Sequence, residues 1–294
     1  MISKFELKGE EVAVQRGLTT LIRILQELLL KEIELERTCR VAVLLSQSGV
    51  NSNNSIFHKL VERCVSNQKR DGGWLSVVET MWCTTYLCMF EEFSPKVKQA
   101  IRWLKTQRHK DGSWGRTKRD MGRIPVTALM LFLLPELASE DNLLWLEKEW
   151  KQEWNLGTEL TYKGAFSLMA FSKNNYKPSD SQIITRIIQW LESEQNDDFG
   201  WGPFKNHPVG STPFCTGVAL SGLLQYSNKV NPKVLQNGLE WLKKNQLPTG
   251  LWADHYIEEG SAWSFFALSK LMAYLKQSQE GKEYVWNLRS LWSI

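Results

Sequence analysis

The chain has 294 residues, of which 43% are hydrophobic and 23% are charged, as is usual for a globular protein. Its formal net charge is +4 with the two signs interspersed, which argues against a nucleic-acid-binding protein. The longest apolar run, residues 126–134, is too short to span a bilayer. Tryptophan is in excess, with 14 residues. Because each indole must bury its rings and still pair its N–H group, this excess indicates a repeated structural role or an aromatic cavity.

The cysteines and the N-terminus together favour a reducing, cytoplasmic location. The five cysteines form no Cys-x-x-Cys pair, and Cys83 and Cys88 have the wrong spacing for a zinc ribbon. The chain begins with charged residues rather than with a signal peptide. We therefore expect a cytoplasmic protein with no metal ion and no cofactor.

The first predicted element is an amphipathic helix over residues 18–35. Leu21 and Leu25 lie on its apolar face, and Arg23 and Glu27 lie opposite. The polar face carries mixed charge, so we expect the helix to pack onto the rest of the protein, with membrane contact that is at most peripheral. Residues 38–45 follow as a short apolar helix.

The rest of the chain is dominated by an internal repeat. Five segments share an amphipathic helix, a glutamine, a short turn that ends near a tryptophan, and a second, apolar helix. The glutamine and tryptophan of the turns are Gln68 and Trp74, Gln107 and Trp114, Gln152 and Trp154, Gln195 and Trp201, and Gln246 and Trp252. A Trp-Leu pair also recurs before the turns, at Trp103, Trp145, Trp190 and Trp241.

The apolar helix after each turn is rich in small residues, as expected of a helix packed on both sides. These helices cover residues 81–90, 126–134, 164–171, 216–224 and 264–271, and residues 38–45 make one more. Outer amphipathic helices paired with inner apolar helices predict an all-α fold, an α/α toroid of the α6/α6-barrel type with about six helix pairs. We expect one domain over 1–294, with an N-terminal helical region 1–37, repeats 38–275 and a tail 276–294.

The turn residues have a structural explanation. Glycine permits a positive φ after a helix end, and aspartate can accept hydrogen bonds from backbone N–H groups. Glutamine can join neighbouring turns, while the tryptophan fills the space between helices. We therefore interpret Asp71, Asp111 and Asp198 as parts of the scaffold rather than of the chemistry.

These turns resemble the QW motifs of the squalene-hopene and oxidosqualene cyclases, a superfamily that includes the protein-prenyltransferase β subunits. The likeness is strongest where residues 200–202 read Gly-Trp-Gly and residues 211–213 read Ser-Thr-Pro. It extends over roughly residues 56–275. The resemblance implies the terpenoid-cyclase toroid and an isoprenoid substrate, although one scaffold can host several functions.

Cyclases of this type protonate a polyprene double bond with the central Asp of an Asp-x-Asp-Asp motif, which this chain lacks. The comparable segment here is residues 76–80, in which Val78 takes the place of the proton donor and Glu79 keeps a carboxyl group. Glu79 is thus a candidate substitute acid. The alternative is a carboxylate at a helix start, where the dipole favours the charged form and opposes proton donation.

The segment after the last turn is the next place to look for an acid or base. Asp254, His255 and Glu258 cluster there with Glu259, although the two glutamates could simply charge the first turn of the following helix. The resemblance to prenyltransferases also raises an Asp254, His255 and Cys215 zinc site, against a buried cysteine and an exposed turn histidine.

Aromatic residues on the inner helices are candidates for substrate binding. In the related cyclases such rings line an apolar pocket and stabilise carbocations through their π faces. The alternative is that they only fill the axis of a small barrel. The candidates are Trp82, Tyr86, Phe166, Phe214, Trp263, Phe265 and Phe266.

We therefore expect a terpene-cyclase-like protein that binds an isoprenoid chain and cyclises it by protonation-type (class II) chemistry. Since such cyclases usually place the reaction between two toroids, a homologous second toroid subunit could carry the acid. The missing Asp-x-Asp-Asp motif favours a non-catalytic binding or interaction protein as the alternative. A zinc prenyltransferase-like enzyme is a second alternative.

Overall fold

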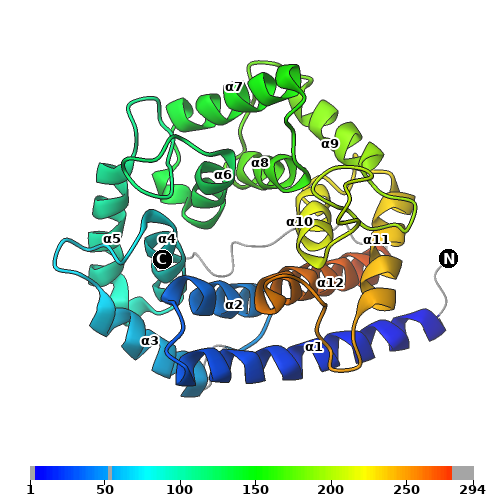
Figure 1. The fold of residues 1–294 in the computed structure, drawn as a ribbon, viewed down its shortest axis with the longest axis horizontal. Helices are drawn as coiled ribbons and strands as arrows, with labels where there is room; N and C mark the ends of the chain where they lie inside the picture. Colours follow the sequence, from blue (N-terminus) through cyan, green and yellow to red (C-terminus); the bar gives the residue numbers. More distant parts are fainter. Residues whose placement is uncertain (1–3, 52–54, 280–294) are drawn as a thin grey trace.

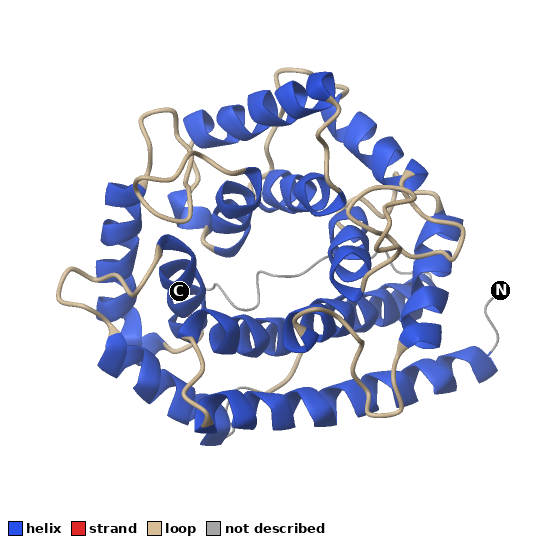
Figure 2. Cartoon of the chain, viewed as in Figure 1, coloured by secondary structure: helices blue, strands red, loops and turns tan. Residues whose placement is uncertain are grey.

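The computed structural model describes residues 4–51 and 55–279. This part of the chain contains twelve α-helices and no strand, arranged as two concentric rings (Figures 1 and 2). The inner ring consists of α2 (Leu35–Gln47), α4 (Val77–Leu87), α6 (Ile124–Leu133), α8 (Thr161–Lys173), α10 (Pro213–Leu224) and α12 (Ile257–Gln279). The outer ring consists of α1 (Lys4–Leu30), α3 (Ser55–Asn67), α5 (Ser94–Gln107), α7 (Glu140–Leu156), α9 (Ile183–Ser193) and α11 (Pro232–Asn245). The short 3-10 helices η1 (Glu91–Phe93) and η2 (Pro135–Leu137) lie in two connections.

The inner ring is closed, which confirms the predicted toroid. Each inner helix contacts the next, and α12 also contacts α2, so the last repeat meets the first (Figure 1). Glycine permits the closest of these approaches. A Cβ atom on Gly217 of α10 would lie 2.6 Å from the backbone of Trp263 in α12, and one on Gly222 would lie 2.8 Å from the backbone of Ala165 in α8.

Helix α1 packs onto the toroid as expected, because Leu21 and Leu25 are fully buried. Its predicted end at residue 35 is wrong, since α1 ends at Leu30 and α2 begins at Leu35. Glu32 adopts a left-handed conformation with φ 52°, and the N–H of Ile33 donates to the carbonyl of Leu28. This is the Schellman termination, here without the glycine that usually signals it.

Four of the five predicted turns share one hydrogen-bonding pattern. The backbone N–H of the turn tryptophan donates to a hydroxyl on the next inner helix at 2.9 Å, and its indole N–H donates at 2.7–3.0 Å to an outer-helix carbonyl. The tryptophan, hydroxyl and carbonyl residues are Trp74, Thr80 and Cys64; Trp114, Thr127 and Leu104; Trp201, Thr216 and Leu191; and Trp252, Ser261 and Leu242. Each tryptophan therefore joins a turn, an inner helix and an outer helix.

In three of these four turns, a glutamine or an aspartate binds the neighbouring repeat. Gln68 donates both to Gly72 in its own turn and to the carbonyl of Lys96 on α5. Gln246 donates to Ala13 of α1 at 2.9 Å, which attaches the last turn to the first helix and helps to close the outer ring. Asp198 accepts the indole N–H of Trp241 at 3.0 Å. The interpretation of these residues as scaffold therefore agrees with their contacts.

The third predicted turn is wrong. Gln152 and Trp154 lie inside α7, which continues to Leu156 and ends at Gly157 with φ 64°. No Asp-Gly or similar turn sequence stands between Gln152 and Trp154, so nothing stops the helix there. Trp154 is 39% exposed and packs against Trp150 and Trp190.

Candidate functional site

A cavity of about 650 Å³ lies at the end of the toroid where the inner helices begin. All six inner helices contribute to its wall, each with residues from its first two turns, so the cavity lies on the toroid axis. Its lining residues are Glu36, Arg40, Ser76, Val78, Met81, Trp82, Arg116, Thr117, Pro125, Val126, Leu129, Tyr162, Phe166, Phe214, Glu259 and Trp263. The wall is mostly apolar and aromatic, and the ionisable residues in it are Glu36, Arg40, Arg116, Tyr162 and Glu259.

One side of the cavity is a continuous aromatic wall. Phe166 of α8 lies 5.5 Å from Trp263 of α12 and 6.4 Å from Phe214 of α10, between ring centroids. Tyr162 extends the wall, with its ring 5.8 Å from that of Phe214. Tilted and edge-to-face contacts hold these rings against one another, so the wall lines the cavity with aromatic side chains in fixed positions.

Four of the seven predicted aromatic residues line the cavity, namely Trp82, Phe166, Phe214 and Trp263. The other three do not. The hydroxyl of Tyr86 donates to the carbonyl of Phe57 on outer helix α3, and Phe265 packs over Gly17 of α1. Phe266 is buried beside Trp263 and Lys270. Helical rotation and position along the axis separate these residues from the cavity, although all seven lie on inner helices.

The rim of the cavity carries a network of ion pairs. Arg40 lies between two carboxylates, 2.6 Å from Glu36 and 2.5 Å from Glu259, and its guanidinium stands over the ring of Trp82. Its side chain is only 11% exposed, so these pairs are largely shielded from solvent. A second pair, Arg37 with Glu258 at 2.6 Å, joins the same two helices, α2 and α12.

Glu36 has a perturbed pKa. Burial raises the pKa of its carboxyl group, Arg40 opposes this effect, and the charges of Glu259 and Glu79 reinforce it. The two carboxylates share one guanidinium, so Glu36 can take up a proton while Arg40 keeps Glu259 as its partner. Glu36 is therefore the carboxyl group of the cavity wall whose pKa is raised by its surroundings.

The four residues predicted as catalytic are placed elsewhere. Glu79 is buried at the start of α4, where its carboxylate accepts the N–H groups of Leu75 at 3.1 Å and Glu36 at 3.4 Å. Glu258 is buried in its pair with Arg37. Asp254 accepts the N–H of Phe214 at 2.9 Å and so holds the start of α10. Each of these three carboxylates is thus paired with another group of the chain, and none of the three lines the cavity wall.

His255, the fourth of these residues, is exposed and packs against Tyr256, with ring centroids 4.5 Å apart. Cys215 is buried, and burial raises the pKa of its thiol to about 11. Among the described residues, Asp254, His255 and Cys215 do not come together as metal ligands. The prenyltransferase-like zinc site is therefore not formed by these three side chains.

Sequence reasoning missed Glu36, Arg40, Arg116 and Tyr162. Glu36 and Arg40 are four residues apart, a spacing that places them on one helix face, but residues 35–47 carried no recognisable turn to fix their orientation. Val78, by contrast, lines the cavity at the position that the resemblance assigned to the proton donor.

The comparisons with known proteins agree with this fold. Residues 140–278 match the family model of the squalene-hopene cyclase C-terminal domain. The chain is 30% identical over 118 residues to protostadienol synthase A of Arthroderma gypseum. The match covers 37% of this chain and 16% of that protein. It is also 30% identical over 135 residues to squalene–hopene cyclase of Zymomonas mobilis. That match covers 42% of this chain and 20% of that protein.

Solved structures give the fold over most of the chain. The type II terpene cyclase MstE from Scytonema matches with a TM-score of 0.69 and 15% identity, over 90% of this chain and 98% of MstE. A protein from Actinoplanes matches with a TM-score of 0.67 and 16% identity, over 90% of this chain and 99% of that one. The chain thus spans a fifth or less of the two curated relatives but nearly all of these single-toroid structures. Within the residues that the structure describes, no helix is long and apolar enough to cross a membrane.

Proposed function

We propose that this chain, which belongs to the squalene-hopene cyclase superfamily, binds an isoprenoid chain in its central cavity and cyclises it by protonation. The observation that carries the proposal is the aromatic wall of Phe166, Phe214 and Trp263 in a cavity lined by all six inner helices. Aromatic π faces attract positive charge, so they would stabilise the carbocations that follow protonation of a double bond.

The size of the cavity supports an isoprenoid occupant. A volume of about 650 Å³ falls within the range of pockets that enclose small molecules. A variant of MstE has been solved with geranylgeranyl dihydroxybenzoate as its substrate, and it matches this chain with a TM-score of 0.65 over 99% of that chain. A prenylated aromatic acid is therefore a sensible first substrate to test here.

We propose that Glu36 supplies the proton. A donor must carry a proton when the substrate binds, and burial raises the pKa of Glu36, against the opposing effects of Arg40 and of the dipole of α2, whose first turn holds Glu36. Its conjugate base must then be stabilised, and Arg40 at 2.6 Å can do this. The proton would pass from the Glu36 carboxyl group to a double bond or epoxide of the substrate. The resulting cation would close rings along the aromatic wall before losing a proton. Glu79, Glu258, Asp254 and His255 would then act only as positioning groups.

The polar end of the substrate fits the rim. Arg116 and Thr117 line the cavity and are exposed, so an anionic head group can reach them from solvent. The starts of six helices lie at this same end of the toroid, and their dipoles also favour negative charge there. We therefore propose that the apolar tail enters the cavity while a carboxylate or diphosphate stays at the rim.

The test is product analysis with a matched variant. The purified chain is incubated with squalene, geranylgeranyl diphosphate and geranylgeranyl dihydroxybenzoate, and products of unchanged mass but altered retention are sought. Glu36→Gln should lower the rate by about 100-fold or more, as loss of a general acid does. Glu136→Gln is the control, because burial also raises the pKa of Glu136 but this residue lies outside the cavity. Equal activity of both variants would rule out Glu36 as the donor.

One observation favours a second function, an isoprenoid-binding protein without catalysis. Val78 occupies the donor position on the cavity wall and cannot release a proton. In that case all three substrates would bind, with quenching of tryptophan fluorescence, and none would be converted. Saturable binding with complete recovery of the substrate would establish this alternative.

A homologous second toroid subunit is a further arrangement that we propose to test separately. MstE is covered over 98% of its length by this chain, which supports a single toroid as a sufficient scaffold. Measurement of the native mass, alone and with lysate from the source cells, distinguishes the two. A stable complex with another toroid protein, together with activity only in that complex, would favour the heteromeric arrangement.

A further inference from the structure

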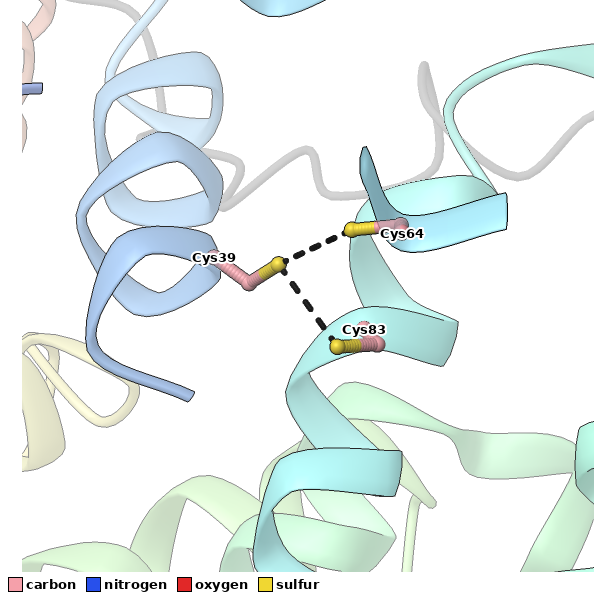
Figure 3. Close-up of side chains that lie close together, drawn as sticks. All are labelled: Cys39, Cys64 and Cys83. Atoms are coloured by element: carbon pink, nitrogen blue, oxygen red, sulfur yellow. Dashed lines mark hydrogen bonds between the residues drawn. The ribbon is translucent and has the colours of Figure 1, made fainter. Parts of the chain in front are cut away.

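Three cysteines from three helices meet in the interior beside the first turn (Figure 3). Cys39 lies on α2, Cys64 on α3 and Cys83 on α4, and all three are fully buried. The Sγ atom of Cys39 is 3.4 Å from that of Cys64 and 3.8 Å from that of Cys83. The three sulfur atoms lie within 4.8 Å of one another.

The cluster is distinct from the cavity. None of the three cysteines lines the cavity wall, and the proposed function uses none of them. The cluster could not be predicted from the sequence, because Cys64 and Cys83 lie 25 and 44 positions after Cys39 and the three form no short metal-binding motif. Only the packing of α2, α3 and α4 brings them together.

We propose that Cys39, Cys64 and Cys83 form a binding site for one soft metal ion, Zn²⁺ or Cu⁺. A zinc–sulfur bond of about 2.3 Å in tetrahedral geometry implies a separation of about 3.8 Å between sulfur ligands. The observed separations of 3.4 and 3.8 Å therefore need little adjustment to hold one ion. Thiolates select zinc and copper(I) over the harder divalent ions.

Burial and mutual hydrogen bonds perturb the thiols of the cluster. Burial raises the pKa of the Cys39 and Cys83 thiols. Burial also opposes ionisation of Cys64, but hydrogen bonds from Cys39 and Cys83 outweigh it and lower the pKa of that thiol. Once bound, a metal ion would lower the pKa of the other two thiols and release their protons.

A disulfide explains the cluster less well. The Cys39 and Cys64 sulfur atoms are 3.4 Å apart and would have to approach to about 2.05 Å. Bond formation also needs an oxidant, and it leaves Cys83 without a role. A metal ion would use all three thiols. It would link α2 and α4, which are neighbours in the inner ring, to the outer helix α3.

The experiment measures metal content directly. Cells grown with added zinc or copper yield the protein without chelators, and the folded chain should contain close to one equivalent of one of these metals. Because the site is closed to solvent, a second arm unfolds the reduced protein, adds Cd²⁺ and refolds it. Thiolate-to-cadmium charge-transfer absorption should then appear at one ion per chain.

Matched variants make the assignment specific. Cys83→Ser should lose the metal and the charge-transfer absorption, whereas Cys88→Ser and Cys215→Ser should keep both. Circular dichroism verifies folding, and if Cys83→Ser fails to fold, Cys39→Ala and Cys64→Ala replace it. A folded wild-type protein with less than a tenth of an equivalent in both arms would overturn the proposal. So would a Cys83→Ser protein that keeps the metal. Neither result bears on the cyclase function.

Discussion

Replacing Thr216 with valine tests the physical basis of the repeat. The hydroxyl of Thr216 accepts the backbone N–H of Trp201 at 2.9 Å, and both residues are fully buried. Valine keeps the shape of threonine but leaves that N–H without an acceptor. An orphaned buried donor costs about 1–3 kcal/mol, so Thr216→Val should lower the free energy of unfolding by that amount.

Thr84→Val provides the matched control. Thr84 is equally buried on an inner helix, but its hydroxyl only donates to the carbonyl of Thr80 within the same helix. Its loss orphans no backbone donor, so the free energy of unfolding should fall by less than in Thr216→Val. For a chain of this length, about 1–3 kcal/mol corresponds to a loss of roughly 2–5 °C in Tm.

Urea unfolding and calorimetry measure these effects, with m unchanged between the proteins. An equal loss of stability in both variants would refute the reasoning, because the hydroxyl would then contribute by packing alone. If only Thr216→Val loses stability, we expect the same loss when the hydroxyls of Thr80, Thr127 and Ser261 are removed. These hydroxyls accept the equivalent hydrogen bond in the other three turns.

Three further predictions concern the charges and the aromatic wall. Because burial raises the pKa of Glu36, cyclisation should fall as the pH rises through that raised pKa, and a pH–rate profile without this limb would count against Glu36 as the acid. Phe214→Leu should weaken isoprenoid binding by about 3- to 10-fold in a fluorescence titration, and unchanged affinity would exclude the aromatic wall as the contact. Glu147 is buried, and although burial opposes its ionisation, Lys151 and the hydrogen bonds of Ser179 lower its pKa to about 2. Glu147→Gln should therefore lower the free energy of unfolding at neutral pH. The difference in stability between the wild type and Glu147→Gln should vanish as the pH falls from about 4.5 to 2. If unfolding of the two proteins depends on pH in the same way, this account of Glu147 is wrong.

The toroid could be predicted from the sequence because the repeat is marked by residues whose polar groups must find hydrogen-bond partners. A turn tryptophan must bury its indole and pair two N–H groups, so Trp74, Trp114, Trp201 and Trp252 recur wherever the geometry recurs. Trp154 shows the limit of this reasoning. Gln152 and Trp154 show the same pairing of glutamine and tryptophan as the true turns, but without a glycine or an aspartate between them the helix continues.

The site was harder to predict, because it depends on where inner helices point relative to the axis. Val78, the residue that the resemblance aligns with the proton donor, lines the cavity, whereas Glu36 and Arg40 required knowledge of how α2 meets α12. Aromatic character alone could not predict that Trp263 lines the cavity while Phe265 faces the outer ring. Two residues along a helix rotate the side-chain direction by more than half a turn, so these two side chains point to opposite sides. The cysteine cluster was also missed, because its three residues lie on three separate helices and form no short motif.

Ligand binding to a protein with a blocked cavity tests the central claim most directly. Leu129 of α6 lines the cavity, and Leu129→Trp would place a bulky indole ring inside it. The wild-type chain should bind geranylgeranyl dihydroxybenzoate saturably at one site, measured by calorimetry. Leu129→Trp, with unchanged circular dichroism, should lose at least 10-fold in affinity. Equal affinity of the two proteins, or no binding by the wild type, would contradict the account of the cavity as an isoprenoid site.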